Sequence, residues 1–331
     1  NVGRHILADG ALPETAPAYD LDIYDSTKGL SLTQNVVSEG GVRIRTKKVD
    51  GDATSALAIG ANDITAAGNV FLGGEGLTQL NGSVINADGA GNAEVGGAIR
   101  IEGGGSTYDI SLAGEVTTDN AGSTAIEIVS ANNATLNTIS ATAGTVALGV
   151  DGKELIGTVA QATPGTSTIS AATLKGDAGV VTVTKSNIDN LGDFITTGAL
   201  VLKDQGGAGT AGLTFTGNVS AGNTTEIQTT DGLLNLVAQN ITINDGLVNK
   251  DLTLRGVGVA QGDASSIKAS TAAIHGGTGN IDLFSAVNDF TGQIDLNSTG
   301  AFAKIQDANN LSLNALTGKL DPTTSLTAWA G

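Results

Sequence analysis

The chain of 331 residues has no cysteine and no methionine. Without cysteine, neither disulfide bonds nor thiolate metal sites can form. This absence leaves an extracellular location open, because a fold held by continuous backbone pairing does not need disulfides. Methionine is missing at position 1 as well, which predicts a processed product or a fragment from which any secretion signal has been removed.

Aromatic residues are scarce, at 3% of the chain, although 40% of the residues are hydrophobic. The apolar content is therefore carried by alanine, valine, isoleucine and leucine. A wide globular interior normally uses aromatic side chains to fill its volume, whereas a thin interior does not need them. The composition predicts a narrow core lined by small aliphatic side chains.

Basic residues are few: 16 lysines and arginines stand against 33 acidic residues, for a net charge of −17. This balance argues against nucleic acid as a partner, because phosphates demand clustered positive charge. One basic cluster, Arg43, Arg45, Lys47 and Lys48, alternates along a strand pattern and is interpreted as a solvated face. No apolar run approaches the roughly 18 to 20 residues that span a bilayer, so the chain is expected to be soluble or held on a surface by partners.

What the chain does contain is a short apolar-x-apolar triplet that recurs from about residue 29 to 318. In a strand, residues i and i+2 share a face, so each triplet points two apolar side chains inward. Strands this short become stable only when many of them stack, as in a solenoid. The pattern predicts a single β-solenoid over residues 29–318, with three strands in each coil of about 25 residues. Clear triplets begin at Leu30, Leu57, Ile99, Ile110, Ile126, Val181, Leu213, Ile241, Leu252, Ile281 and Leu311.

Glycine-rich turns separate the triplets, and their uneven spacing predicts corner loops of different lengths. Gly73-Gly74, Gly103-Gly104-Gly105 and Gly206-Gly207 are expected to supply the positive φ angles that such corners require. No segment shows sustained 3.6-residue periodicity, so no long helix is expected.

The two ends of the chain depart from the triplet pattern. Residues 1–28 contain two prolines and read as an arm that either caps the first coil or reaches a neighbouring subunit by strand addition. Residues 319–331 hold the single tryptophan and are either a cap or a contact with the next molecule. The candidate subunit-contact residues are Pro13, Pro17, Tyr19, Tyr24 and Trp329.

Several segments share one repeat style, in which Asn, Asp and Gly are mixed with short apolar stretches. They are 288–292, 294–296 and 307–313, with similar wording at 232–236 and 239–243. These segments resemble the repeats of large bacterial surface proteins, the filamentous-haemagglutinin-like and autotransporter-type adhesins. The resemblance is clearest from about 210 to 318. It implies a right-handed parallel β-helix exported across a Gram-negative envelope for adhesion or for building a surface fibre. The Asn-rich secretion motifs of two-partner adhesins are missing, so the export route is left open.

Residues that could carry chemistry are sparse. His5 and His275 are the only histidines, which argues against a histidine-based triad or a multi-histidine metal site. A polysaccharide-cleaving enzyme would need clustered acids. Asp282 and Asp307 have the spacing to stack on one face, whereas Asp295 is expected on another face. With few aromatics to stack on a sugar, no catalytic, cofactor-binding or metal residue is predicted.

Seven Asn-x-Ser/Thr sequons invite two interpretations, glycosylation or structural use of the asparagines. Asn240 and Asn310 precede triplets and are candidates for the stacked asparagine ladders of solenoid corners. The full sequon set is Asn81, Asn133, Asn218, Asn223, Asn240, Asn297 and Asn310.

The sequence thus leads to one main functional hypothesis. The chain is predicted to be a secreted, non-enzymatic structural subunit of an extracellular surface fibre, without cofactors, that self-associates end to end through its terminal segments. The alternative is an adhesin fragment on the cell surface that binds a host surface or a glycan. A polysaccharide-degrading β-helix enzyme is the third interpretation.

Overall fold

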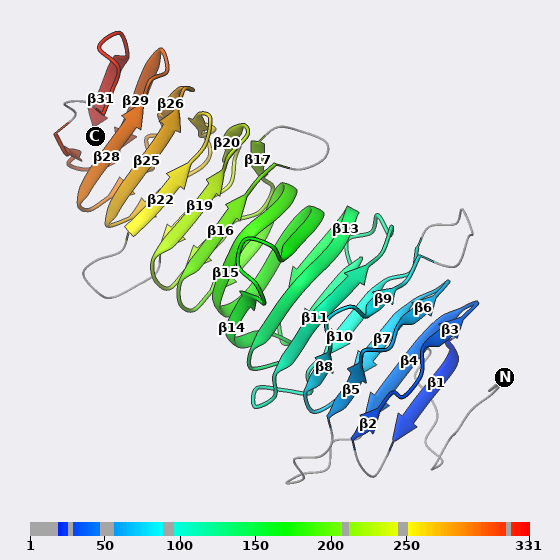
Figure 1. The fold of residues 1–331 in the computed structure, drawn as a ribbon. Coiled ribbons are helices and arrows are strands. Elements are labelled where there is room, and N and C mark those ends of the chain that lie inside the picture. Colours follow the sequence, from blue (N-terminus) through cyan, green and yellow to red (C-terminus); the bar gives the residue numbers. More distant parts are fainter. Residues whose placement is uncertain are drawn as a thin grey trace. The chain divides into compact units, whose positions relative to one another are not determined.

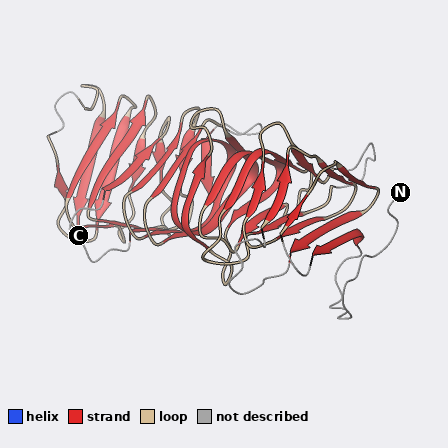
Figure 2. Cartoon of the chain, turned by 60° about the horizontal axis from the view of Figure 1, so that its bottom comes forward, coloured by secondary structure: helices blue, strands red, loops and turns tan. Residues whose placement is uncertain are grey.

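The computed structural model describes residues 19–25, 29–46, 56–88, 96–206, 212–243, 251–315 and 319–331. Within these ranges the regular structure is entirely β-strand, and no helix occurs (Figure 2). The all-β prediction is therefore confirmed. The chain divides into two compact units, Asn1–Ala172 and Thr173–Gly331, and strand β15 (Thr168–Thr196) contains the boundary. Each unit is a stack of parallel coils (Figure 1).

Three parallel ladders run through the first unit, because every third strand pairs with the strand one coil away. Ladder A1 contains β1 (Tyr19–Asp25), β4 (Gly41–Thr46), β7 (Val70–Gly73), β10 (Ile99–Glu102), β12 (Ile126–Val129) and the end of β13 (Ala134–Leu148). Ladder B1 contains β2 (Leu30–Ser31), β5 (Leu57–Gly60), β8 (Leu77–Gln79), the start of β11 (Ile110–Thr117), the start of β13 and β14 (Leu155–Gln161). Ladder C1 contains β3 (Val36–Ser38), β6 (Ile64–Ala66), β9 (Val84–Asn86), the end of β11 and the middle of β13.

The second unit repeats this arrangement. Ladder A2 runs from β15 through β16 (Leu200–Asp204), β19 (Thr225–Thr229), β22 (Asp251–Arg255), β25 (Thr271–Gly277) and β28 (Gln293–Ser298) to β30 (Ser312–Leu313). Ladder B2 runs from β15 through β17 (Gly212–Phe215), β20 (Leu233–Asn235), β23 (Val259–Ala260), β26 (Ile281–Leu283) and β29 (Phe302–Asp307) to β31 (Ser325–Ala330). Ladder C2 contains β15, β18 (Val219–Ala221), β21 (Ile241–Ile243), β24 (Ile267–Ala269) and β27 (Asp289–Phe290).

The inward positions of the triplets form the core, as the two-residue period predicts. In β10, Ile99 and Ile101 are fully buried while Arg100 between them points outward. Ladder pairing stacks like on like: Val42 lies opposite Val70, and Val70 opposite Ile99. Each such side chain contributes about 1.5 to 3 kcal/mol relative to an exposed position. The prediction of three strands per coil with a thin aliphatic core is confirmed.

The corner glycines agree with the prediction only in part. Gly104, Gly105 and Gly206 have positive φ angles of 85°, 134° and 94°. The prediction is wrong for Gly103, and for Gly73 and Gly74, because the positive φ of the 73–76 corner falls on Gly76, at 87°. Gly74 is required for space instead, since a Cβ there would lie 2.7 Å from the Thr46 hydroxyl oxygen.

Strands lie inside both segments that the sequence sets apart from the triplet region. In residues 1–28, β1 pairs in parallel with β4. In residues 319–331, β31 pairs in parallel with β29. Pro13 and Pro17 lie outside the described residues.

Candidate functional site at the terminal coils

Strand β31 continues the interior pattern of ladder B2 to the last described coil of the second unit. Its register places Leu326 opposite Ala303 and Ala328 opposite Ile305, and both of these partners are fully buried. Leu326 therefore occupies an inward column, yet 40% of it is exposed, because the described structure places no further coil over it. β31 is the last described strand of this ladder (Figure 1). The ladder therefore ends in a partly exposed aliphatic side chain beside a strand edge.

The first described coil has the same character. In β1, Leu21 lies opposite Val42 and Ile23 opposite Ile44, and both β4 residues are fully buried. Leu21 and Ile23 are only half-buried, although their positions are inward ones. Within the described residues, the register gives β1 a single partner strand, β4. Aliphatic side chains and backbone groups of an edge strand thus lie together at this end of the first unit.

The predicted contact residues Tyr24 and Trp329 lie on outer faces rather than in the inward columns. The guanidinium carbon of Arg45 lies 5.1 Å from the ring centroid of Tyr24, which is a cation–π distance. Trp329 is opposite Gln306 and is 59% exposed. Tyr19 pairs with Gly41 through its backbone. The inward residues at the ends, Leu326 among them, were missed because an end coil is recognised only once the register is known.

The described part of the basic cluster, Arg43 and Arg45, is paired with an acidic side chain. Arg43 and Arg45 point outward from β4 and are half-buried. Both form ion pairs with Asp22 of β1, and the Arg45 Nη2 to Asp22 Oδ2 distance is 3.4 Å. Lys47 and Lys48 lie outside the described residues. The interpretation of Arg43 and Arg45 as part of a solvent-facing surface agrees with this geometry.

The acids considered for catalysis do not converge. Asp282 faces outward, with its Oδ2 3.9 Å from Lys304 Nζ, whereas Asp307 is fully buried and its Oδ1 accepts a hydrogen bond from the Phe290 N–H at 3.2 Å. The expectation that these two acids share a face is wrong, because the alternation of β29 places Asp307 on the inward face with Ala303 and Ile305, whereas Asp282 lies on the outward face of β26. Asp295 lies in ladder A2, on a different face, as predicted.

His275 lies on β25 opposite Asn297. Burial, together with the charge of Arg255, lowers the pKa of His275, so the imidazole is neutral at physiological pH. His5 lies outside the described residues. Among the described residues, no three His, Asp or Glu side chains gather in a way that could hold a metal ion.

Asparagines at the corners between ladders do form ladders of their own. Asn218 Oδ1 accepts a hydrogen bond from the Asn240 N–H at 2.9 Å, and Asn240 Oδ1 accepts one from the Ser266 N–H at 2.8 Å. Asn240 is therefore part of an asparagine ladder, which is the structural interpretation of its sequon. Asn310 is exposed.

Comparison of the chain with family models, with curated proteins and with solved structures finds no match. A search of the described residues also finds no helix long and apolar enough to cross a membrane. The class that the fold defines is the parallel β-solenoid.

Proposed function

We propose that this chain is a non-enzymatic structural subunit of an extracellular surface fibre, in which copies add end to end through their terminal coils. The observation that carries the proposal is the aliphatic inward column at both described ends. Leu21 and Ile23 line one end, and Leu326 and Ala328 line the other. A solenoid that stays monomeric normally needs polar capping at its ends to remain soluble.

A second copy stacked on a terminal coil would satisfy two needs at once. Its strand would pair with the edge of β31 or β1 that faces no partner strand among the described residues, which continues the parallel ladder by strand addition. Its inward residues would cover the partly exposed aliphatic side chains. Each leucine or isoleucine buried in this way contributes about 1.5 to 3 kcal/mol.

The extracellular, cell-surface location rests on the resemblance of residues 210–318 to bacterial surface adhesins. The non-enzymatic role is supported by the separation of Asp282 from the buried Asp307. It is also supported by the position of Trp329, the only tryptophan, which lies opposite Gln306 on an outer face and is 59% exposed.

The test is self-assembly of the purified chain, followed by sedimentation velocity over a range of concentrations and by electron microscopy. We expect concentration-dependent filaments. Leu326→Lys places a charge in the inward column of β31 and should abolish them. Thr327→Lys changes the same strand on its outward face, opposite Lys304, and should leave assembly largely intact. A chain that stays monomeric at high concentration, or that assembles equally well with Leu326→Lys, would refute the proposal.

A polar pocket in the second unit favours the adhesin role as a second candidate. The pocket has a volume of about 370 Å³ and lies over ladder A2, lined by Thr253, Thr271, Gln293, Asp295 and Asn314 among others. Hydroxyl, amide and carboxylate groups are those that bind sugar hydroxyls. A glycan array with a reproducible hit that Gln293→Ala removes, together with an absence of filaments, would favour this role over the fibre.

A further inference from the structure

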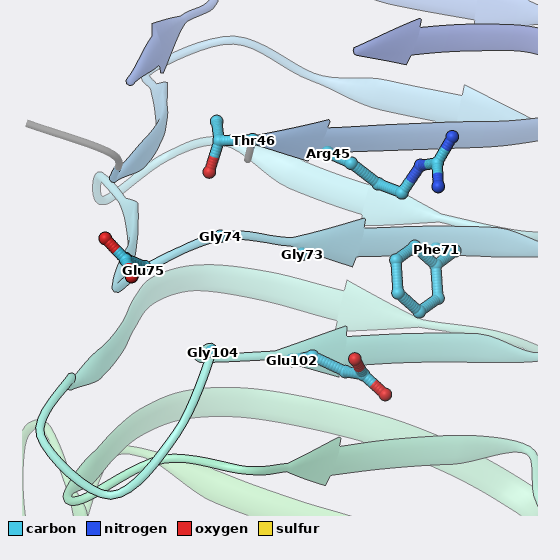
Figure 3. Close-up of a pocket in the computed structure, with 8 residues that line it drawn as sticks. All are labelled: Arg45, Thr46, Phe71, Gly73, Gly74, Glu75, Glu102 and Gly104. Carbon is cyan, nitrogen blue, oxygen red and sulfur yellow. The ribbon is translucent and has the colours of Figure 1, made fainter. Parts of the chain in front are cut away.

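A pocket of about 170 Å³ opens on the outer face of ladder A1 (Figure 3). Its lining includes Arg45, Phe71, Gly73, Glu75 and Glu102, which come from three successive coils. Gly73 of β7 is opposite both Arg45 of β4 and Glu102 of β10. The outward column therefore lacks a side chain at its middle position, between a basic and an acidic neighbour.

Phe71 leans toward the gap that Gly73 leaves. A Cβ at position 73 would lie 3.0 Å from Cε1 of the Phe71 ring. The φ angle of Gly73 is not in the left-handed region, so its backbone does not require glycine. A side chain at this position would displace the ring and fill the pocket. The absence of a side chain at position 73 keeps the pocket open.

Glu75 is the unusual residue of this pocket. Only 5% of it is exposed, and both of its carboxylate oxygens are buried without accepting a hydrogen bond. Figure 3 shows its side chain at the corner beyond Gly74, while Glu102 lies at the other side of the pocket. A buried, unpaired carboxylate is strongly unfavourable, and a positively charged group that pairs with it would remove this cost.

The charged neighbours of Glu75 are already committed to other partners. Glu102 Oε1 accepts hydrogen bonds from Arg100 Nε at 2.8 Å and from Lys153 Nζ at 2.7 Å. Arg45 pairs with Asp22 and stacks on Tyr24. Glu75 is therefore the carboxylate of this pocket that remains available to an added cation.

The chemistry of the pocket selects among cations. A calcium ion takes six to eight oxygen ligands, and the described residues offer no group of three acidic or histidine side chains for any metal. An ammonium group is a strongly hydrated point charge and is costly to bury. A guanidinium group is planar and weakly hydrated, and its fork matches the two free oxygens of one carboxylate.

We propose that this pocket binds a guanidinium group through a bidentate ion pair with Glu75. The group is supplied by an arginine side chain of a protein partner or by a small guanidine compound. The inference is independent of end-to-end assembly, because the pocket lies on the outer face of the coils and not at their ends.

The test is titration of the isotopically labelled full chain carrying Leu326→Lys, which is expected not to assemble, with Nα-acetyl-arginine amide. Binding is followed by the amide chemical shifts of Gly73, Gly74 and Gly76. Nα-acetyl-citrulline amide is the neutral isostere, and Nα-acetyl-lysine amide is the ammonium control. Methylguanidinium separates the two sources, because a site built for an arginine side chain binds the arginine amide more tightly than the bare group. A site for small guanidines binds both equally.

We expect saturable shifts with the arginine compound, weaker binding of the lysine compound, and none with the citrulline compound. Glu75→Gln and Gly73→Val should each weaken binding at least tenfold, the first by removing the charge and the second by filling the pocket. Glu115→Gln, an exposed glutamate of β11, is the matched charge control and should bind as the parent does. Circular dichroism checks that each variant is folded. Equal binding of the arginine and lysine compounds, unchanged affinity in Glu75→Gln, or no saturation at tens of millimolar would overturn the proposal.

Discussion

The two units of the chain each bury a carboxylate, but they treat it in opposite ways. Asp204 in the second unit is fully buried and accepts four hydrogen bonds, whereas Glu75 in the first unit is nearly as buried and accepts none. Stacked coils can therefore hold a buried carboxylate either hydrogen-bonded or unpaired. The outcome depends on whether the neighbouring corners place hydrogen-bond donors within reach of it. The donors to Asp204 are Ile188 N at 3.0 Å, Gly206 N at 2.9 Å, Ser186 Oγ at 3.1 Å and Thr229 Oγ1 at 3.3 Å.

The cores of the two units differ as well. Phe194, Phe215 and Phe290 are fully buried in the second unit. In the first unit the buried hydrophobic side chains of the described residues are all aliphatic, and Phe71 lies on the outer face. The same three-strand coil can thus bury a phenylalanine ring in the second unit, while most buried side chains in both units are aliphatic.

The largest effect on the free energy of unfolding is expected from removing the hydrogen-bonded carboxylate of Asp204. Asp204→Ala leaves two backbone N–H groups and two hydroxyls without their shared acceptor in a buried corner. Each unpaired buried donor costs about 1 to 3 kcal/mol, and relaxation of the hydroxyls leaves a net loss of about 3 kcal/mol. Urea unfolding monitored by circular dichroism measures this loss. Asp204→Asn retains an acceptor oxygen and should lose less, and an unchanged midpoint in Asp204→Ala would break the comparison.

A smaller effect of opposite sign is expected at Glu75. Glu75→Gln removes a buried charge that has no partner, so the free energy of unfolding should rise by about 1 kcal/mol. Urea midpoints measured side by side with Glu115→Gln, which should not change, provide the comparison. A lower urea midpoint for Glu75→Gln would mean that the Glu75 carboxylate stabilises the fold, which would contradict the contrast with Asp204.

The smallest effect is a difference in pH dependence between the two units. Burial raises the pKa of Asp204 above its usual 3.8, despite the hydrogen bonds that it accepts. The part of its contribution to stability that depends on protonation is therefore complete below that value and is lost as the pH rises through the raised pKa. Burial acts to raise the pKa of Glu102 also, but the hydrogen bonds from Lys153 and Arg100 prevail and hold it below 4.5. The contribution of Glu102 is complete above 4.5 and is lost as the pH falls.

Urea midpoints measured from about pH 2.5 to 6 sharpen this contrast, because these limits bracket the ordinary carboxylate pKa values. The stability of the parent relative to Asp204→Asn should decrease with rising pH, and its stability relative to Glu102→Gln should increase. Parallel curves for the two variants would contradict the contrast.

Much of the fold could be predicted because its determinants are local. A triplet such as Ile99-Arg100-Ile101 fixes a strand and its inward face from three neighbouring residues. The corner at Gly73-Gly74 was assigned the wrong glycine, because several glycines in a row share the same permissive backbone and only the path of the coil selects Gly76.

The buried acids could not be predicted for the opposite reason. Asp204 meets Ser186 and Thr229 across coils, and uneven corner lengths hide that register from the sequence. Glu75, between Gly74 and Gly76, reads as an exposed turn. The one sequence feature that could have indicated the burial of Glu75 is a glutamate between glycines in a corner. This feature predicts burial only once the positions of the neighbouring coils are known.

Parallel pairing of each coil with the next has a mechanical consequence. The backbone hydrogen bonds of a unit point from coil to coil, so a pull along the stacking direction loads all three ladders at once, in line with their bonds. Because each coil contacts mainly its two neighbours, rupture under tension proceeds as peeling of one coil at a time. A unit damaged at one coil therefore keeps the remaining coils folded, and these coils offer a template on which the peeled segment can rewind when the tension is released.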